Sequence, residues 1–260
     1  MLQGKTALVT GSTSGIGWGI ASALAADGAA IMLNGFGDAA TIDRLKRELA
    51  YRHEVKVGYS AADVSKPAEI REMVAATAAE LGPVDILINN AGIQHVAPIE
   101  KFPEEKWDAI IAINLSAAFH TTKAVLPTMR NRGWGRIVNI SSSHGLVASE
   151  DKAAYVAAKH GIIGLTKVTA LEAASSLITC NAICPGWVKT PLVERQIEAR
   201  ARDAKQPVAD AARDMLKEKQ ALLAFTTPEQ IGAMVVFLAS EAAATMTGAA
   251  LSMDGGWVAH

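Results

Sequence analysis

Short segments that are apolar almost throughout recur along the chain, and longer stretches with helical spacing separate them. The apolar segments are predicted strands, at Thr6–Thr10, Ala29–Asn34, Val55–Ser60, Val84–Asn89, Arg136–Ser141, Ile178–Cys184 and Ala249–Met253. Helices are expected near 15–27, 38–52, 67–81, 103–131, 153–174 and 228–239. Strands without polar alternation, separated by helices, are typical of a parallel sheet covered on both faces. The pattern predicts a doubly wound α/β fold with its ligand at the carboxyl ends of the strands.

The pattern changes to mixed charge between Thr190 and Thr227. Two stretches, Val193–Arg202 and Ala211–Lys219, have amphipathic helical spacing, and Gln206 and Pro207 separate them. We expect two helices that lie outside the sheet. From these residues alone, a solvated helical hairpin and a functional segment over about 190–227 are equally good interpretations.

Composition and charge narrow the class of protein. The chain has 260 residues, 50% of them hydrophobic and 20% charged, with a net charge of −1. It lacks the basic footprint of proteins that bind nucleic acid or anionic membranes. We find no uninterrupted run of about eighteen apolar residues that predicts a transmembrane helix, and no signal peptide before the strand at Thr6. We therefore expect a cytoplasmic protein with neither nucleic-acid nor membrane partners.

The cysteines and histidines indicate no cross-link and no metal centre. Cys180 and Cys184 lie four residues apart on a predicted strand, too far along an extended backbone for a disulfide. We expect reduced, buried thiols. The histidines form no metal-binding motif with each other or with the cysteines. They are His53, His95, His120, His144, His160 and His260.

Ser142, Tyr155 and Lys159 have a spacing that permits acid–base chemistry. Tyr155 and Lys159 are four residues apart, so they share one face of a helix, and Ser142 follows a predicted strand. A phenol with a pKa near 10 needs a neighbouring cation to act as a base at neutral pH. A cation about 4 Å away contributes about 4 kcal/mol at an effective dielectric of about 20, which is about three pKa units. Such a pair can also be purely structural. The surrounding motifs decide between a catalytic and a structural role.

A glycine-rich turn joins the first predicted strand to the first predicted helix. Gly11, Gly15 and Gly17 have the spacing G-x3-G-x-G. Backbone amides without side-chain obstruction at a helix N-terminus suit the pyrophosphate of a dinucleotide. A plain glycine-rich turn is the alternative, and the Asn-Asn-Ala-Gly motif at 89–92 weakens it.

Together these motifs resemble the short-chain dehydrogenase/reductase family along essentially the whole chain. They are Thr10–Gly17, Asn89–Gly92, Asn114, Ser142, Tyr155–Lys159 and Pro185–Gly186. The resemblance implies one Rossmann-type domain over residues 1–260, a seven-stranded parallel sheet in the order 3-2-1-4-5-6-7, and a substrate lid at about 190–227. Further runs are most similar to bacterial members that oxidise (R)-3-hydroxybutyrate. These are Gly92–His95, Ser143–Val147, Ile183–Val188 and Gln196.

The resemblance also implies catalytic roles. Tyr155 would be the general base for alcohol oxidation, and Ser142 would donate a hydrogen bond to the substrate oxygen. Lys159 would assist Tyr155 and hold the nicotinamide ribose. Asn114 would position a water that connects Lys159 to solvent. The hydride would pass to the cofactor.

NAD is the expected cofactor. Asn34–Gly37 stands where NAD enzymes generally carry an acidic residue, and neither Ser12–Ser14 nor Gly35–Asp38 supplies the cation that NADP enzymes generally use. By family match, Phe36 lies beside the adenosine, Asp63 and Val64 meet the adenine, and Asn90 meets the adjacent ribose. The full set of implied cofactor contacts is Gly11, Thr13, Gly15, Ile16, Gly17, Phe36, Asp63, Val64, Asn90, Gly92, Tyr155, Lys159, Pro185, Val188 and Thr190.

A small carboxylate is the implied substrate. Four polar residues would hold its carboxylate, two tryptophans would form apolar walls, and Ser142 and Tyr155 would face the reacting carbon. The polar residues are Gln94, His144, Lys152 and Gln196, and the walls are Trp187 and Trp257. Each alone has an ordinary surface or packing interpretation; the convergence of four favours a carboxylate clamp.

Two other functions remain open. One is a 3-oxoacyl-thioester reductase that uses NADP and an acyl carrier, which the missing basic cofactor signal disfavours. The other is a non-catalytic dinucleotide-binding sensor or scaffold, which the complete set Asn114, Ser142, Tyr155 and Lys159 disfavours. The resemblance further implies a homotetramer formed through the helices near 103–131 and 153–174 and the C-terminal strand.

Overall fold

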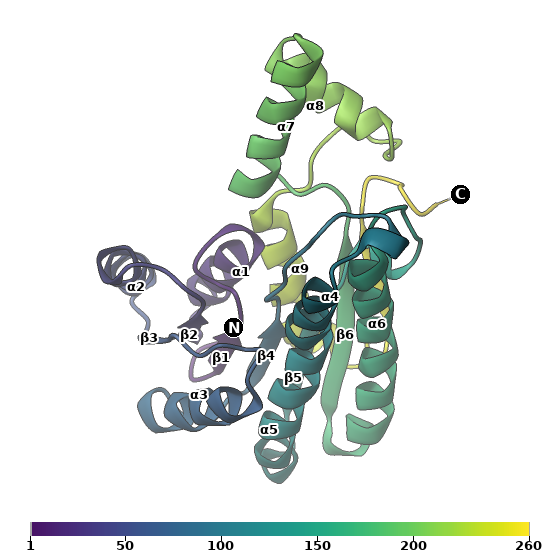
Figure 1. The fold of residues 1–260 in the computed structure, drawn as a ribbon. Helices are drawn as coiled ribbons and strands as arrows, with labels where there is room; N and C mark the ends of the chain where they lie inside the picture. The colour runs from purple at the N-terminus through teal and green to yellow at the C-terminus, as the bar shows by residue number, and fades with distance from the viewer. Residues whose placement is uncertain (1, 260) are drawn as a thin grey trace.

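All seven predicted strands form one parallel sheet in the computed structural model, which describes residues 2–259 (Figure 1). The strand order is β3-β2-β1-β4-β5-β6-β7, as the family resemblance implied. The strands are β1 (Thr6–Val9), β2 (Ala30–Asn34), β3 (Val57–Ser60), β4 (Ile86–Asn89), β5 (Gly135–Ile140), β6 (Ile178–Pro185) and β7 (Ala250–Met253). Every residue of β1, β4, β5 and β6 is buried, because helices cover both faces.

The two helical layers bury separate apolar clusters. Adjacent residues of β1 point to opposite faces, so Leu8 packs in one cluster and Val9 in the other. On the side of Val9 lie α1 (Gly15–Ala26), α2 (Ala39–His53) and α9 (Pro228–Ala239). On the side of Leu8 lie α3 (Pro67–Glu80), α5 (Ala117–Arg132) and α6 (Ala153–Ala173). Strand order reverses between β1 and β4, which is the place where doubly wound folds bind ligands.

The helix predicted near 103–131 is interrupted. It consists of α4 (Glu104–Ile111), a π-helical turn at Ala112–Ser116, and α5. Asn114 lies in the π turn, and its side chain accepts a hydrogen bond from Ile93 N and donates one to Ile93 O, both at 2.9 Å. Hydrophobic periodicity averages over several turns, so it cannot register one widened turn.

The same segment is also unusually long and apolar. Glu104–Arg132 is the one helical stretch of residues 2–259 that is long and apolar enough to qualify as a membrane span, with a mean hydropathy of 1.4. Interior helices of folded α/β proteins meet the same criteria. Here α5 packs against α3 and against β4 and β5, as a core helix does.

Two helices stand above the carboxyl ends of the strands, at the top of Figure 1. They are α7 (Pro191–Ala204) and α8 (Val208–Lys217), and Pro207 is the N-cap of α8. They bury an apolar cluster of their own, against which Trp187 and Phe225 pack. The cluster consists of Val193, Ile197, Ala201, Ala211 and Met215. The predicted pair of helices outside the sheet is therefore confirmed.

Cys180 and Cys184 are free and buried, as predicted. Burial raises the pKa of the Cys180 thiol to about 12 and raises that of Cys184 as well. Within residues 2–259, the His, Cys, Asp and Glu side chains form no group of three or more that could hold a metal ion. His260 lies outside the described residues.

Candidate active site

The turn after β1 has a shape that only glycine permits. Gly11 has φ +61°, and a Cβ there would lie 2.9 Å from Ala91 Cα. A Cβ on Gly17 would collide with Gly11 O. The N-cap residue of α1, Ser14, makes no side-chain cap, so the first amides of the helix remain for an anion. These features fit a dinucleotide pyrophosphate.

Residues that follow β4 fasten this turn. Asn90 Nδ2 donates to Thr10 O and Gly11 O, both at 2.9 Å, and Thr10 Oγ1 accepts from Asn90 N at 3.0 Å. Both amide hydrogens of Asn90 are thereby occupied. A ribose contact of the kind expected for Asn90 would have to use its Oδ1.

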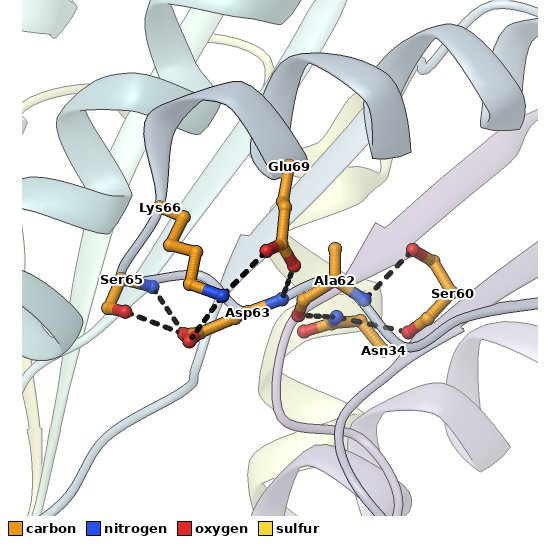
Figure 2. Close-up of polar contacts among 7 residues, drawn as sticks. All are labelled: Asn34, Ser60, Ala62, Asp63, Ser65, Lys66 and Glu69. Atoms are coloured by element: carbon orange, nitrogen blue, oxygen red, sulfur yellow. Dashed lines mark hydrogen bonds and ion pairs between the residues drawn. The ribbon is translucent and has the colours of Figure 1, made fainter.

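Asn34, at the end of β2, explains the missing acidic residue. Its Oδ1 accepts from Gly11 N at 3.3 Å, and its Nδ2 donates to Ser60 O and Ala62 O at 3.1 and 2.9 Å (Figure 2). A carboxylate at this position could accept the first bond but could not donate the other two. Asn34 therefore links the ends of β1, β2 and β3.

Asp63 is held in place beside this link (Figure 2). Its Oδ1 accepts from Ser65 Oγ at 2.7 Å and from Ser65 N at 2.9 Å, and Lys66 Nζ lies 3.7 Å from Oδ2. These bonds, those from Ser65 first, hold the pKa of Asp63 below its usual value. Asp63 is thus an oriented carboxylate, next to the buried Val64. Across the turn, Phe36 is 71% exposed and its carbonyl accepts from Thr13 Oγ1.

Ser142, Tyr155 and Lys159 come together at the carboxyl end of β5. Tyr155 and Lys159 lie one turn apart on α6, with Lys159 Nζ 5.6 Å from the centroid of the Tyr155 ring. Ser142 follows β5 and hydrogen-bonds to the Tyr155 side chain. Its Oγ also accepts from His144 N at 3.1 Å, which fixes the serine at the start of a 3₁₀ turn. The predicted constellation is present.

The electrostatics of this group differ from the expectation. Burial raises the pKa of the Tyr155 phenol, and the bond with Ser142 offsets this only in part. Burial also lowers the pKa of Lys159 to about 8. Lys159 Nζ donates to Ile140 O at 2.7 Å, so a backbone carbonyl, and not only the phenol, interacts with the ammonium group. In the protein alone, Lys159 therefore does not make Tyr155 acidic.

A small cavity adjoins the buried end of Lys159. It has a volume of about 10 Å³, and Asn114, Asn89 and Thr10 are among its lining residues. This volume is about what one water molecule needs, and the lining offers polar partners. The side chain of Asn114 itself is engaged with Ile93.

His144 lies between Tyr155 and the C-terminal segment. Its ring centroid is 6.0 Å from that of Tyr155 and 5.1 Å from that of Trp257. Trp257 in turn lies 5.9 Å from Trp187. His144 Nε2 is 2.8 Å from Ser149 Oγ. The structure thus places the imidazole of His144 next to Tyr155, and the apolar rings of Trp257 and Trp187 follow it.

Several cations surround this pocket. Burial lowers the pKa of His144 to about 4, and the charges of Lys152 and Lys219 add to the effect. Burial likewise lowers the pKa of Lys152, followed by the charges of Lys219 and Arg200. His144 is therefore neutral at pH 7. The positive charge in the pocket comes from the lysines and the arginine.

Comparison with known proteins decides the family. A family model described as enoyl-(acyl carrier protein) reductase matches residues 11–258. A protein named D-beta-hydroxybutyrate dehydrogenase from Cupriavidus necator is 61% identical over 100% of both chains. The chain belongs to the short-chain dehydrogenase/reductase family. A second D-beta-hydroxybutyrate dehydrogenase, from Rhizobium meliloti, is 51% identical over 98% of this chain and 99% of that protein.

Solved structures agree with this assignment. A crystal structure of a variant of actinorhodin polyketide ketoreductase with NADPH has a TM-score of 0.90 and 35% identity, and covers 98% of each chain. The short-chain dehydrogenase/reductase fold is confirmed, and folds of this kind bind their ligand at the carboxyl ends of the strands.

Two predicted residues of this short-chain dehydrogenase/reductase stand apart from the pocket. Gln94 follows β4 in an irregular segment and Gln196 lies on α7, and both are exposed. Within residues 2–259, neither forms a hydrogen bond to His144 or Lys152. The remaining members of the predicted clamp converge on one side of Tyr155.

Sequence reasoning missed Gln220. Its side chain is buried, its Oε1 accepts from Trp187 N at 2.9 Å, and its Nε2 donates to Leu222 O and Ala224 O at 3.3 and 3.1 Å. It fastens the chain after α8 to the segment that follows β6. A single glutamine in a polar stretch carries no sequence signal of such a role.

Proposed function

We propose that this short-chain dehydrogenase/reductase oxidises (R)-3-hydroxybutyrate to acetoacetate, reversibly, with NAD. The protein is an oxidoreductase of its family, and its high identity over full length with proteins named D-beta-hydroxybutyrate dehydrogenase supports 3-hydroxybutyrate as substrate. The observation that carries the proposal is the His144 ring packed against Tyr155, with the Lys152 side chain close enough to act on the pKa of His144.

The chemistry follows from the positions of the side chains. Tyr155, once ionised to the phenolate, would take the hydroxyl proton of the substrate, and the Ser142 hydroxyl would donate to the same oxygen as negative charge develops on it. A bound oxidised nicotinamide would supply the hydride acceptor, and its positive charge would favour the phenolate until the hydride is transferred. Lys159, with three N–H donors, can retain Ile140 O while it meets a ribose hydroxyl. The cavity beside Lys159 offers room for the water assigned to the proton path through Asn114.

The carboxylate of the substrate would be held at the opposite end of the pocket. Lys152 forms no ion pair with any carboxylate of residues 2–259, so its charge is available for an anion. His144 would donate as a neutral imidazole, with the hydroxyl of Ser149 on its Nε2. Trp187 and Trp257 would exclude water from the four-carbon chain. Closure of α7 would bring Gln196 to the same carboxylate and act as a lid.

NAD, rather than NADP, is the cofactor we propose. A solved neighbour was crystallised with NADPH, so the fold alone does not select NAD. In this chain, Asn34 uses its side chain to link three strands and Phe36 follows it without an adjacent cation. A 2′-phosphate there would lose hydration without gaining a charged partner.

A substrate panel tests the function. The purified enzyme is assayed for NADH or NADPH formation with (R)- and (S)-3-hydroxybutyrate, and for the reverse reaction with a 3-oxoacyl thioester. We expect turnover of the (R)-acid with NAD to exceed every other combination. Preference for the thioester with NADPH would replace the proposal with a reductase of fatty-acid type, and the absence of all turnover would favour a dinucleotide-binding sensor.

We further propose a cytoplasmic homotetramer. Buried, reduced cysteines accord with a reducing compartment. Apolar side chains on the outer faces of α4, α5 and α6 remain exposed in the single chain, and subunit contacts would cover them. These side chains are Trp107, Phe119, Val168 and Leu171.

A further inference from the structure

Lys219 lies two residues beyond the end of α8, and its side chain approaches the substrate pocket. Its Nζ is 5.9 Å from the centroid of the Trp257 ring. Trp257 packs edge-on against His144, which packs edge-on against Tyr155. A continuous series of ring contacts therefore leads from this lysine to the catalytic tyrosine.

The backbone at Lys219 is fixed, although the side chain is exposed. Lys219 N donates to Leu216 O at 3.1 Å. The next residue, Gln220, is buried and bonds to Trp187 N through its side chain. Because Trp187 forms another wall of the pocket, these bonds fix the backbone at Lys219 relative both to that wall and to the end of α8.

The charges around Lys219 are unbalanced. Of the three cations that act on the pocket, Arg200 pairs with Glu218 at 2.7 Å. Across residues 2–259, neither Lys152 nor Lys219 has an ion-pair partner. The charge of Lys219 contributes to lowering the pKa of Lys152, after burial. Two repelling cations without a carboxylate are unfavourable until an anion lies between them.

We propose that Lys219 is a specificity-determining residue, a second cation that attracts the carboxylate of a small 3-hydroxy acid toward Lys152. This rests on the proposed function and extends it to a residue outside the predicted clamp. Lys219 acts through its field on substrate entry and binding, because charges at the rim of a site change association more than chemistry. It therefore affects KM and leaves the proton transfer at Tyr155 unchanged.

The experiment compares Lys219→Met with Lys217→Met. Lys217 is an exposed lysine at the end of α8, so its variant removes the same charge from the same segment. We expect Lys219→Met to raise KM for (R)-3-hydroxybutyrate by about threefold to tenfold, as for a partly screened charge pair, with kcat within about twofold. KM for NAD should stay unchanged. Lys219→Glu should raise KM further, whereas Lys217→Glu should not.

Salt provides the readout that a structural defect would not reproduce. KM of the wild type and of Lys217→Met should rise with ionic strength more steeply than KM of Lys219→Met. Equal KM values and equal salt slopes in both methionine variants would overturn the inference. A loss of kcat equal to the change in KM would overturn it too. Wild-type enzyme that fails to oxidise 3-hydroxybutyrate would instead refute the proposed function.

Discussion

Single residues in the pocket owe their charge states to burial. Tyr155 and His144 are both kept neutral, because burial raises the pKa of the phenol and lowers that of the imidazole to about 4. Burial lowers the pKa of Lys159 to about 8, so this amine carries its proton when the pH is below that value. Any positive charge near the expected carboxylate therefore comes from the lysine and arginine side chains around His144, not from His144 itself. A bound positive nicotinamide would be needed to lower the pKa of Tyr155.

Tyr155→Phe isolates the proton-transfer role, because it removes only the phenolic oxygen. We expect kcat to fall by about a hundredfold or more, the usual contribution of a positioned acid or base. Affinity for NADH, measured by fluorescence titration, should be largely kept. A variant that retains a tenth of the wild-type rate would show that another group is the base.

His144 makes stability depend on pH. Its pKa is 6.5 in the unfolded reference state and about 4 in the folded protein. Between pH 4 and pH 6.5 the unfolded chain therefore binds more protons than the folded protein. Stability therefore falls as pH falls through this window. The free energy of unfolding, measured with urea, should fall less steeply at acid pH in His144→Gln than in the wild type. The control, His120→Gln, removes a histidine outside the pocket and should keep the wild-type slope.

At the scale of elements, the two helices above the sheet are attached through the segments on either side of them. Gln220 joins their return segment to Trp187, Thr226 N donates to Trp187 O at 3.0 Å, and Leu222 N donates to Gly255 O at 2.9 Å. The pair buries an apolar cluster of its own, which is the property expected of a segment that closes as a unit.

Gln220→Ala tests the attachment. It leaves Trp187 N and two carbonyls without partners, at about 1–3 kcal/mol for each group that stays buried. We expect lower stability, faster hydrogen exchange around Trp187, and a higher KM for the hydroxy acid. Gln206→Ala, in the exposed turn between α7 and α8, is the matched control. Unchanged exchange at Trp187 would contradict the assigned role.

We expect the loop after β2 to set the preference between NAD and NADP. Gly35 has φ +145° and a Cβ there would lie 2.9 Å from Thr13 Oγ1, whereas a Cβ on Gly37 meets only the end of Ile42 at 3.1 Å. Gly37→Arg is therefore the better-tolerated of the two substitutions. It should lower the ratio of kcat/KM for NAD over NADP by supplying a cation for the phosphate. Gly37→Gln, which adds no charge, should leave the ratio near that of the wild type.

At the scale of the whole molecule, the exposed apolar side chains on α4, α5 and α6 predict association. Light scattering should give the mass of four chains. Leu171, on α6, is 83% exposed, and Leu171→Asp should shift the mass toward smaller species by placing a charge in the expected interface. Tyr51→Asp changes a residue on α2 that is 91% exposed, and the tetramer should persist. A monomeric wild type would contradict this assembly.

The sequence by itself determined the architecture and the proximity of Tyr155 and Lys159. Apolar strands alternating with helices specify a parallel sheet because both faces must be buried, and all seven strands were found within two residues of their predicted limits. Tyr155 and Lys159 were predictable as neighbours because helical spacing places i and i+4 on one face. Short-range periodicity and local motifs carry this information.

The tertiary structure alone decided what depends on contacts between distant segments. Asn114 widens a helix because its side chain bonds to Ile93, twenty-one residues away. Asn34 replaces an acidic residue because three strand ends need its donors and acceptor. Gln220 is positioned by its bond to Trp187, and Lys219 by its contact with Trp257. The lowered pKa of His144 follows from its burial. Burial and long-range hydrogen bonds exist only once the chain has folded, so no local pattern could reveal them.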